Sequence, residues 1–223
     1  MKAIVQDRYG PAGVLRAAEI ERPEPGAGEI VVRVRAAGVD PGVWHLMAGL
    51  PYMMRLMGFG LRRPKERVRG WDAAGTVEAV GAGVTRFAPG DDVFGVGSGG
   101  TFAEYCRGAA DMFAAKPADV DFDAAAAAPT SAVTALRALR DAGGLRTGGH
   151  VLVLGAGGGV GTFAVQLAKA RGAEVTGVCG TDKTELVRSL GADHVVDYTE
   201  RDVTAGTGRY DIVLDTAGNR PLA

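Results

Sequence analysis

Residues 151–161, with the sequence VLVLGAGGGVG, decide the fold of this chain. The apolar strand pattern at 151–154 runs directly into a glycine-rich turn, and apolar residues then recur at helical spacing. Glycines let a backbone turn tightly and approach a pyrophosphate, and the helix that follows presents free N–H groups to it. A glycine cluster alone is weak evidence, because many such loops merely turn. The strand–turn–helix context predicts a dinucleotide site at Gly155, Gly158, Gly159, Val160 and Gly161.

The residues after this turn alternate between strand and helix patterns. The first helical pattern ends at Gly172, an apolar strand follows at 174–179, and a second helical pattern ends at Gly191. Two further strand patterns occupy 194–198 and 210–215. This βαβαβ alternation predicts a parallel sheet with helices on both faces. The uncharged stretch 151–168 is long enough for a membrane span, but its glycines and this alternation favour the sheet.

The first hundred residues have a different pattern, in which short runs of Val, Ala or aromatic residues are bounded by Gly, Pro or Asp. The Met-rich segment 43–61 is an exception and predicts a helix or an irregular flap. Composition shifts near residue 122, where an Ala-rich helical pattern begins and continues to residue 140. We therefore expect two domains, 1–122 and 123–223. The first should be a barrel or sandwich with strands at 2–6, 29–36, 75–80, 91–96 and 101–107.

Charge and cysteine content exclude several classes of protein. The 25 Lys and Arg residues balance 26 Asp and Glu residues, and the net charge of −1 supplies no field to attract nucleic acid or an anionic membrane. The cysteines Cys106 and Cys179 cannot form a disulfide framework or a four-thiolate zinc site, which fits a reducing cytosol. Residues 1–8 carry charges where a signal peptide needs an apolar run. We expect a cytoplasmic protein without nucleic-acid or membrane partners.

The residues at the end of the second strand pattern bear on the choice between NAD(H) and NADP(H). An NAD site usually has an acidic residue there, which holds the ribose hydroxyl. This chain has Val178-Cys179-Gly180-Thr181 instead, and Lys183 could meet a 2′-phosphate. We expect NADP(H), with Thr181 and Lys183 at the adenosine end, and NAD(H) as the alternative. A solvated Lys183 near a helix start is the structural alternative, and the neighbouring Asp182 disfavours a phosphate.

Six motifs in this order resemble the medium-chain dehydrogenase/reductase superfamily, in its zinc-independent, quinone-oxidoreductase-like branch. They are VRAAGV at 34–39, VEAVG at 77–81, PGDDV at 89–93, GAGGGVG at 155–161, LGAD at 190–193 and DIVLD at 211–215. The resemblance implies an α/β fold in which a GroES-like β-barrel domain, the catalytic or substrate domain, precedes a Rossmann domain. It also implies an NADP(H)-dependent enzyme that transfers a hydride between nicotinamide and a quinone, enone, or small carbonyl or alcohol.

The resemblance also predicts that no metal is bound. Zinc-dependent members of the family carry a catalytic Cys after the Ala-Gly-Val segment, then a Gly-His-Glu, then another Cys. The matching positions here are Asp40, Gly70-Trp71-Asp72 and Thr130. Tryptophan cannot ligate zinc, and Asp with Thr is a poor substitute for soft thiolates.

Without a metal, a side chain or solvent must supply the proton that accompanies the hydride. Asp40, His45 and Tyr52 are the candidates, because the resemblance places Asp40 where quinone reductases usually have Asn and His45 at a proton-relay position. Asp40 could instead cap a helix at 41–48, and His45 could be an ordinary polar residue. By analogy, Thr134 is a predicted neighbour of the nicotinamide and Tyr198 a predicted neighbour of the adenosine phosphate.

Two further features leave alternatives open. The first is a run of six basic residues that contains one acid, Glu66, and predicts a solvated loop. The alternatives are a lid over an anionic cofactor or a contact for an acidic surface. The basic residues are Arg55, Arg62, Arg63, Lys65, Arg67 and Arg69. The chain also stops at Ala223 after four of the six strands of a doubly wound sheet. We expect an incomplete Rossmann domain, from a longer enzyme or a truncated homologue, in which the family's homodimer is doubtful. The alternative is a non-catalytic nucleotide-binding or interaction protein.

Overall fold

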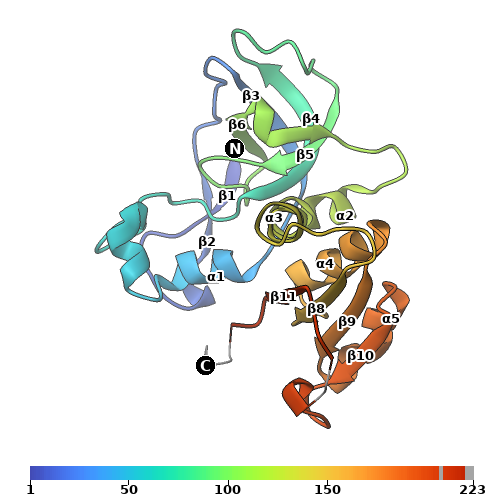
Figure 1. Cartoon of the computed structure of the whole chain (residues 1–223). Coiled ribbons are helices and arrows are strands. Elements are labelled where there is room, and N and C mark those ends of the chain that lie inside the picture. The colour runs from blue at the N-terminus through green and yellow to red at the C-terminus, as the bar shows by residue number, and fades with distance from the viewer. Residues whose placement is uncertain (206–207, 219–223) are drawn as a thin grey trace. The chain divides into compact units, whose positions relative to one another are not determined.

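The computed structural model describes residues 1–205 and 208–218 (Figure 1). The chain divides into two compact units, Met1–Thr130 and Ser131–Ala223, so the division falls later than the predicted boundary at residue 122. The reason is helix α2 (Phe122–Ala127), which packs Ala125 and Ala126 against the sheet of the first unit, beside Ala74. The Ala-rich segment therefore begins in the first unit and continues into the second.

The N-terminal unit is built on an antiparallel sheet. Within residues 1–130, all of which are described, it has five strands in the order β6-β3-β4-β5-β7, and a separate pair β1-β2. Aliphatic and aromatic side chains from alternate positions form its core, including Ile30, Val32, Val77, Val93 and Phe113. The strands are β1 (Lys2–Val5), β2 (Arg16–Glu19), β3 (Glu29–Ala37), β4 (Asp72–Val80), β5 (Asp92–Val96), β6 (Tyr105–Ala109) and β7 (Phe113–Ala115).

All five strands predicted for this unit are present, with ends that differ by a few residues. The sequence pattern missed β2 and β7, because β2 has no β-branched residue and β7 has only three residues. The segment 43–61 contains most of helix α1 (Pro41–Ala48) and a π-helical turn η2 (Arg55–Phe59), so both predicted descriptions apply to parts of it. Two short 3₁₀ turns, η1 (Ala12–Val14) and η3 (Ala110–Met112), connect strands.

The C-terminal unit is built on a parallel sheet. Its described strands are β8 (His150–Leu154), β9 (Glu174–Cys179), β10 (His194–Asp197) and β11 (Ile212–Asp215), paired in the order β10-β9-β8-β11. This order matches the first four strands of a doubly wound dinucleotide-binding sheet. Helices α4 (Gly159–Ala170) and α5 (Thr184–Ser189) contribute Ala164, Val165 and Val187 to one apolar core. The predicted Rossmann topology is confirmed over the described strands.

The remaining helical segments differ from the single long helix expected at 122–140. Pro129 begins a new helix, α3 (Pro129–Arg137), which ends in a π-helical turn η4 (Ala138–Ala142). Proline lacks the N–H that would continue the ladder from α2. The 3₁₀ turns η5 (Thr181–Lys183) and η6 (Val203–Ala205) follow strands of the parallel sheet. Over residues 1–205 and 208–218 no helix is long and apolar enough to cross a membrane, and the stretch 151–168 is divided between β8 and α4.

Candidate functional site

The glycine-rich turn joins β8 to α4 at the carboxyl end of the parallel sheet. The Gly155 and Ala156 N–H groups both donate to the Val178 carbonyl of the neighbouring strand, at 3.0 and 2.9 Å. Gly155 has φ +79°, a left-handed conformation that favours glycine, and a Cβ there would lie 2.6 Å from Thr216 Oγ1. The turn is thus held by β9 on one side and by the segment after β11 on the other.

Two further glycines of the turn have different structural roles. A Cβ on Gly161 would lie 2.1 Å from the Gly155 carbonyl oxygen, so this glycine allows the first turn of α4 to pack onto the loop. A Cβ on Gly158 would meet only that oxygen, at 3.3 Å. Gly158 is the N-cap of α4 and supplies no side-chain acceptor to the helix. No side chain therefore caps the N-terminal N–H groups of α4, and the glycines 157–159 in front of them carry no Cβ, which is the arrangement that binds a pyrophosphate.

The residues predicted for the adenosine end gather beside this turn. A Cβ on Gly157 would lie 2.7 Å from the Cβ of Lys183, so the lysine side chain starts against the loop. A Cβ on Gly180, at the end of β9, would lie 3.3 Å from the Tyr198 hydroxyl. Thr181 Oγ1 lies 3.1 Å from Thr199 Oγ1. The loops that follow β8, β9 and β10 thus come together at the carboxyl end of the parallel sheet.

Carboxylates also lie at this carboxyl end of the sheet. Asp197, at the end of β10, accepts hydrogen bonds from Thr199 N at 2.9 Å and Thr199 Oγ1 at 2.7 Å. Hydrogen bonding by the Thr181 hydroxyl, followed by the two Thr199 contacts, holds the pKa of Asp197 below its usual value. Asp182 Oδ2 lies 3.8 Å from Lys183 Nζ, and both side chains are exposed. Asp197 therefore fixes the threonines, while Asp182 partly neutralises the lysine.

Thr134, the predicted nicotinamide neighbour, lies on α3 with an exposed side chain. The same helix places Ser131 at the glycine turn, because a Cβ on Gly159 would lie 3.1 Å from Ser131 Oγ. Val160, which follows Gly159, is half-buried and packs on the core of the C-terminal unit. The residues at this carboxyl end of the sheet fit a dinucleotide: a bare helix N-terminus, glycines that leave room for phosphates, and hydroxyls beside them.

In the N-terminal unit, Asp40 is the N-cap of α1 and is fully engaged. Its Oδ1 accepts hydrogen bonds from Gly42 N at 2.6 Å and Val43 N at 3.2 Å. Its Oδ2 accepts a hydrogen bond of 2.6 Å from Trp71 Nε1. Asp40 thus caps α1, as the alternative to a catalytic role predicted. Its hydrogen bond with Trp71 was not predicted.

Asp72, which follows Trp71, is buried with an exposed fraction of 3%. It accepts hydrogen bonds from Thr130 N at 2.9 Å and Thr130 Oγ1 at 2.6 Å. Burial raises the pKa of Asp72 and the nearby Asp40 carboxylate raises it further, while the Thr130 hydrogen bonds act in the opposite direction. We call Asp40, Trp71, Asp72 and Thr130 the polar cluster.

The polar cluster consists of the positions that the resemblance matches to the Cys, Gly-His-Glu and second Cys of zinc-dependent members, and its residues do not fit zinc. Trp71 has an indole N–H, which donates but cannot ligate a metal. Both oxygens of Asp40 and both oxygens of Asp72 already accept hydrogen bonds. Among the described residues, no group of three or more His, Cys, Asp or Glu side chains could hold a metal ion.

His45 and Tyr52, the other predicted proton donors, lie in and just after α1. His45 Nδ1 is 2.9 Å from the Leu50 carbonyl oxygen, and its ring makes an edge contact with Trp44. Tyr52 is 69% exposed, and the Arg55 guanidinium lies over its ring at 4.8 Å. Asp40 thus caps the helix that carries His45, and within the described residues 1–130 no hydrogen bond joins the side chains of the three predicted donors.

Replacing Asp40 by alanine should lower the free energy of unfolding by about 2 kcal/mol, because the helix cap and the Trp71 hydrogen bond are lost together. The matched control is Asp121→Ala, which removes the N-cap of α2, a contact of 2.7 Å with Ala124 N, and nothing further. That control should cost about 1 kcal/mol. Urea denaturation followed by circular dichroism measures both, and equal losses would contradict a stabilising Asp40–Trp71 contact.

A GroES-like unit followed by a dinucleotide-binding sheet is the architecture of an alcohol dehydrogenase-type oxidoreductase. Residues 26–118 match the family model "Alcohol dehydrogenase GroES-like domain", and residues 159–223 match "Zinc-binding dehydrogenase". The chain belongs to the medium-chain dehydrogenase/reductase superfamily, a family of oxidoreductases.

Individual relatives agree with this assignment. The chain is 34% identical to the chloroplast envelope quinone oxidoreductase homolog of Arabidopsis thaliana, over 100% of this chain and 70% of that protein. It is 35% identical to the chloroplastic NADPH-dependent alkenal/one oxidoreductase of the same plant, over 98% of this chain and 58% of that protein. The solved quinone oxidoreductase of Coxiella burnetii superposes with a TM-score of 0.86 at 30% identity, covering 98% of this chain and 69% of that one. The chain spans part of each relative's length.

Proposed function

We propose that this chain is the NADP(H)-binding part of a zinc-independent oxidoreductase whose substrate is a quinone, an enone or a small carbonyl compound. The observation that carries the proposal is the turn 155–161, in which the glycines 157–159 leave the uncapped N-terminus of α4 free of side chains. The names of the relatives support these substrate classes, since they include a quinone oxidoreductase and an alkenal/one oxidoreductase. The hydrogen-bonded polar cluster supports a reaction without zinc.

NADP(H) is favoured over NAD(H) by the adenosine end of the site. The end of β9 carries Cys179, Gly180 and Thr181, none of which can accept hydrogen bonds from both ribose hydroxyls as a carboxylate does. Lys183 begins against the glycine turn and can approach a 2′-phosphate. The alkenal/one relative is named as NADPH-dependent, which agrees with this preference.

The bound nicotinamide would supply the hydride, and the residues of this chain would bind and orient. The glycine turn and the first turn of α4 hold the pyrophosphate through backbone N–H groups. Thr181, Lys183 and Tyr198 contact the adenosine end, and Thr134 lies toward the nicotinamide. His45 is our proposed proton donor: Nδ1–H donates to the Leu50 carbonyl, so the imidazolium form would carry a second proton on Nε2 that it could transfer to a substrate. Tyr52 is the second candidate, and Asp40 positions α1 and Trp71.

The direct test is a fluorescence titration with NADPH, followed by oxidation assays with a quinone and an enone. We expect saturable NADPH binding and oxidation of NADPH in the presence of substrate, measured in parallel for this chain and for a version extended to the length of its relatives. No binding to either version would overturn the proposal. Binding by both without turnover in either would favour the non-catalytic alternative.

Replacing Lys183 by methionine should weaken NADPH binding about tenfold and leave NADH binding unchanged, because only NADPH has the 2′-phosphate that the lysine would contact. Arg171→Met is the matched control, since Arg171 is exposed at the opposite end of α4. Parallel titrations with the two nucleotides measure the ratio. A Lys183→Met protein with an unchanged ratio would contradict the assignment of the lysine.

A further inference from the structure

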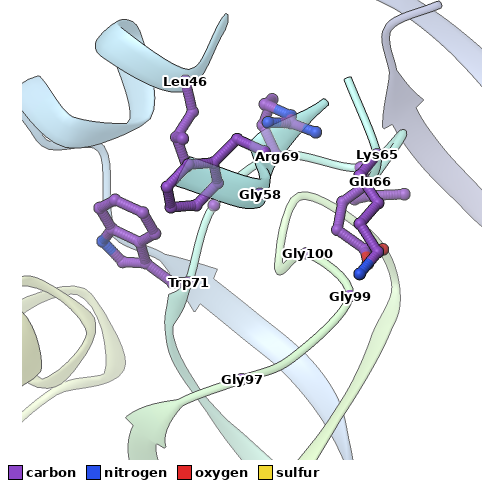
Figure 2. A pocket seen from close by; sticks show the side chains of 12 residues that line it. Leu46, Gly58, Lys65, Glu66, Arg69, Trp71, Gly97, Gly99 and Gly100 are labelled. Carbon is purple, nitrogen blue, oxygen red and sulfur yellow. The ribbon is translucent and has the colours of Figure 1, made fainter. Parts of the chain in front are cut away.

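The N-terminal unit contains a pocket whose lining residues all belong to that unit. Its volume is about 290 Å³, at the small end of ligand pockets. Leu46, Phe59 and Trp71 form apolar walls, and Lys65, Glu66 and Arg69 provide its charges, while glycine backbone completes the lining (Figure 2). We call it the Arg69 pocket.

Arg69 departs from the basic run in which it occurs. Arg62, Arg63, Lys65 and Arg67 are exposed, as predicted for a solvated loop. Arg69 is only 5% exposed, which corrects that prediction for this residue. Its backbone carbonyl accepts hydrogen bonds from Thr101 N and Phe102 N, both at 2.9 Å, and these bonds tie residue 69 to the loop after β5.

Two nitrogens of the buried Arg69 guanidinium have no hydrogen-bond partner. Within residues 1–130, all described, neither Nε nor Nη2 of Arg69 has an acceptor. Burial lowers the pKa of Arg69, whereas Tyr9 and the Glu66 carboxylate raise it. Arginine nevertheless stays protonated in proteins, and a buried unpaired charge is costly. A buried group left unsatisfied in this way needs an explanation, and a bound ligand is one that would complete it.

We propose that the Arg69 pocket binds a small monocarboxylate with an apolar tail, and that the carboxylate pairs with the Arg69 guanidinium. A guanidinium is planar and matches a carboxylate through two parallel hydrogen bonds. Lys65 and Arg69 against Glu66 leave one net positive charge, which a monoanion balances and a phosphate dianion exceeds. The apolar walls of Leu46, Phe59 and Trp71 suit a hydrocarbon or aromatic tail. This inference does not depend on hydride transfer.

The test compares two probes of the same shape by isothermal titration calorimetry on the full chain. Trans-cinnamate carries the carboxylate, and trans-cinnamamide is its neutral counterpart. We expect cinnamate to bind at least tenfold more tightly than cinnamamide. Equal affinities for the wild-type protein would overturn the proposal, whatever any variant shows. Stronger binding of inorganic phosphate than of cinnamate would overturn the choice of a carboxylate.

Variants then locate the binding. Arg69→Met should weaken cinnamate binding at least tenfold and leave the affinity for cinnamamide unchanged, so that the two probes bind with similar affinity. Arg67→Met is the matched control, because Arg67 is exposed and pairs with Asp7 at 2.8 Å. It should change neither affinity. The melting temperature of Arg69→Met should not fall, since the variant removes an unpartnered buried charge. Cinnamate affinity that survives in a folded Arg69→Met protein would refute the site.

Discussion

Replacing Gly161 by alanine is expected to abolish NADPH binding and to lower the free energy of unfolding by about 3 kcal/mol. The added methyl group would lie 2.1 Å from the Gly155 carbonyl oxygen and 2.8 Å from Ala156 Cα, both of them backbone atoms that cannot rotate away. The first turn of α4 must then move off the loop, and the N–H groups that would face the pyrophosphate move with it. Urea denaturation and NADPH titration measure the two effects.

Gly158→Ala provides the control in the same turn. Its methyl group would meet only the Gly155 oxygen, at 3.3 Å, and the residue has φ −90°, which alanine adopts readily. Stability should therefore change by less than about 1 kcal/mol. NADPH binding should still weaken, because the methyl group lies at the N-cap where a phosphate would approach. A loss of stability as large as that of Gly161→Ala would show that the two glycines do not have separate roles.

Replacing Asp72 by alanine should lower the free energy of unfolding by about 2 kcal/mol. The change removes two hydrogen bonds to Thr130 and leaves a small cavity in the buried end of β4. Asp72→Asn keeps an acceptor oxygen of similar shape and should cost much less. Equal losses in the two variants would show that the Thr130 hydrogen bonds contribute nothing measurable.

The same residue gives an expected pH dependence. The pKa of Asp72 is raised in the native protein above its usual value of 3.8, so the native state holds this proton more tightly than the unfolded state. The contribution of Asp72 is most favourable below pH 3.8 and declines as the pH rises through its native pKa. Asp72→Asn should remove this decline. The test measures the free energy of unfolding of the wild-type and Asp72→Asn proteins across the acid range. An equal slope against pH in the two proteins would contradict the raised pKa of Asp72.

The architecture of the C-terminal unit could be predicted from local pattern, because each apolar strand is followed by a glycine turn or a helical face. The glycine turn at 155–161 was found for the same reason. Helix breaks were harder: Pro129 divides a segment whose alanines all favour a helix. The edge strands β2 and β7 lack the β-branched residues on which a sequence pattern depends.

The Trp71 hydrogen bond and the burial of Arg69 were not predicted, because both depend on contacts between distant segments. Trp71 and Asp40 are 31 residues apart, and only the folded sheet brings the indole N–H to the carboxylate. Arg69 lies between charged, exposed neighbours in sequence, so no periodicity indicates that it is buried. Lys183, by contrast, lies in the loop directly after β9, where parallel-sheet topology already directs it to the glycine turn.

The polar cluster has a consequence for how a member of this superfamily could gain or lose a metal during evolution. Asp40→Cys would remove the cap of α1 and the acceptor of Trp71 in one step. Trp71→His would leave Asp40 without its indole partner, and no ligand set would yet exist to compensate. Each of these two substitutions therefore removes a hydrogen bond before a set of metal ligands exists. Building a zinc site at these positions would therefore require several changes together rather than one at a time.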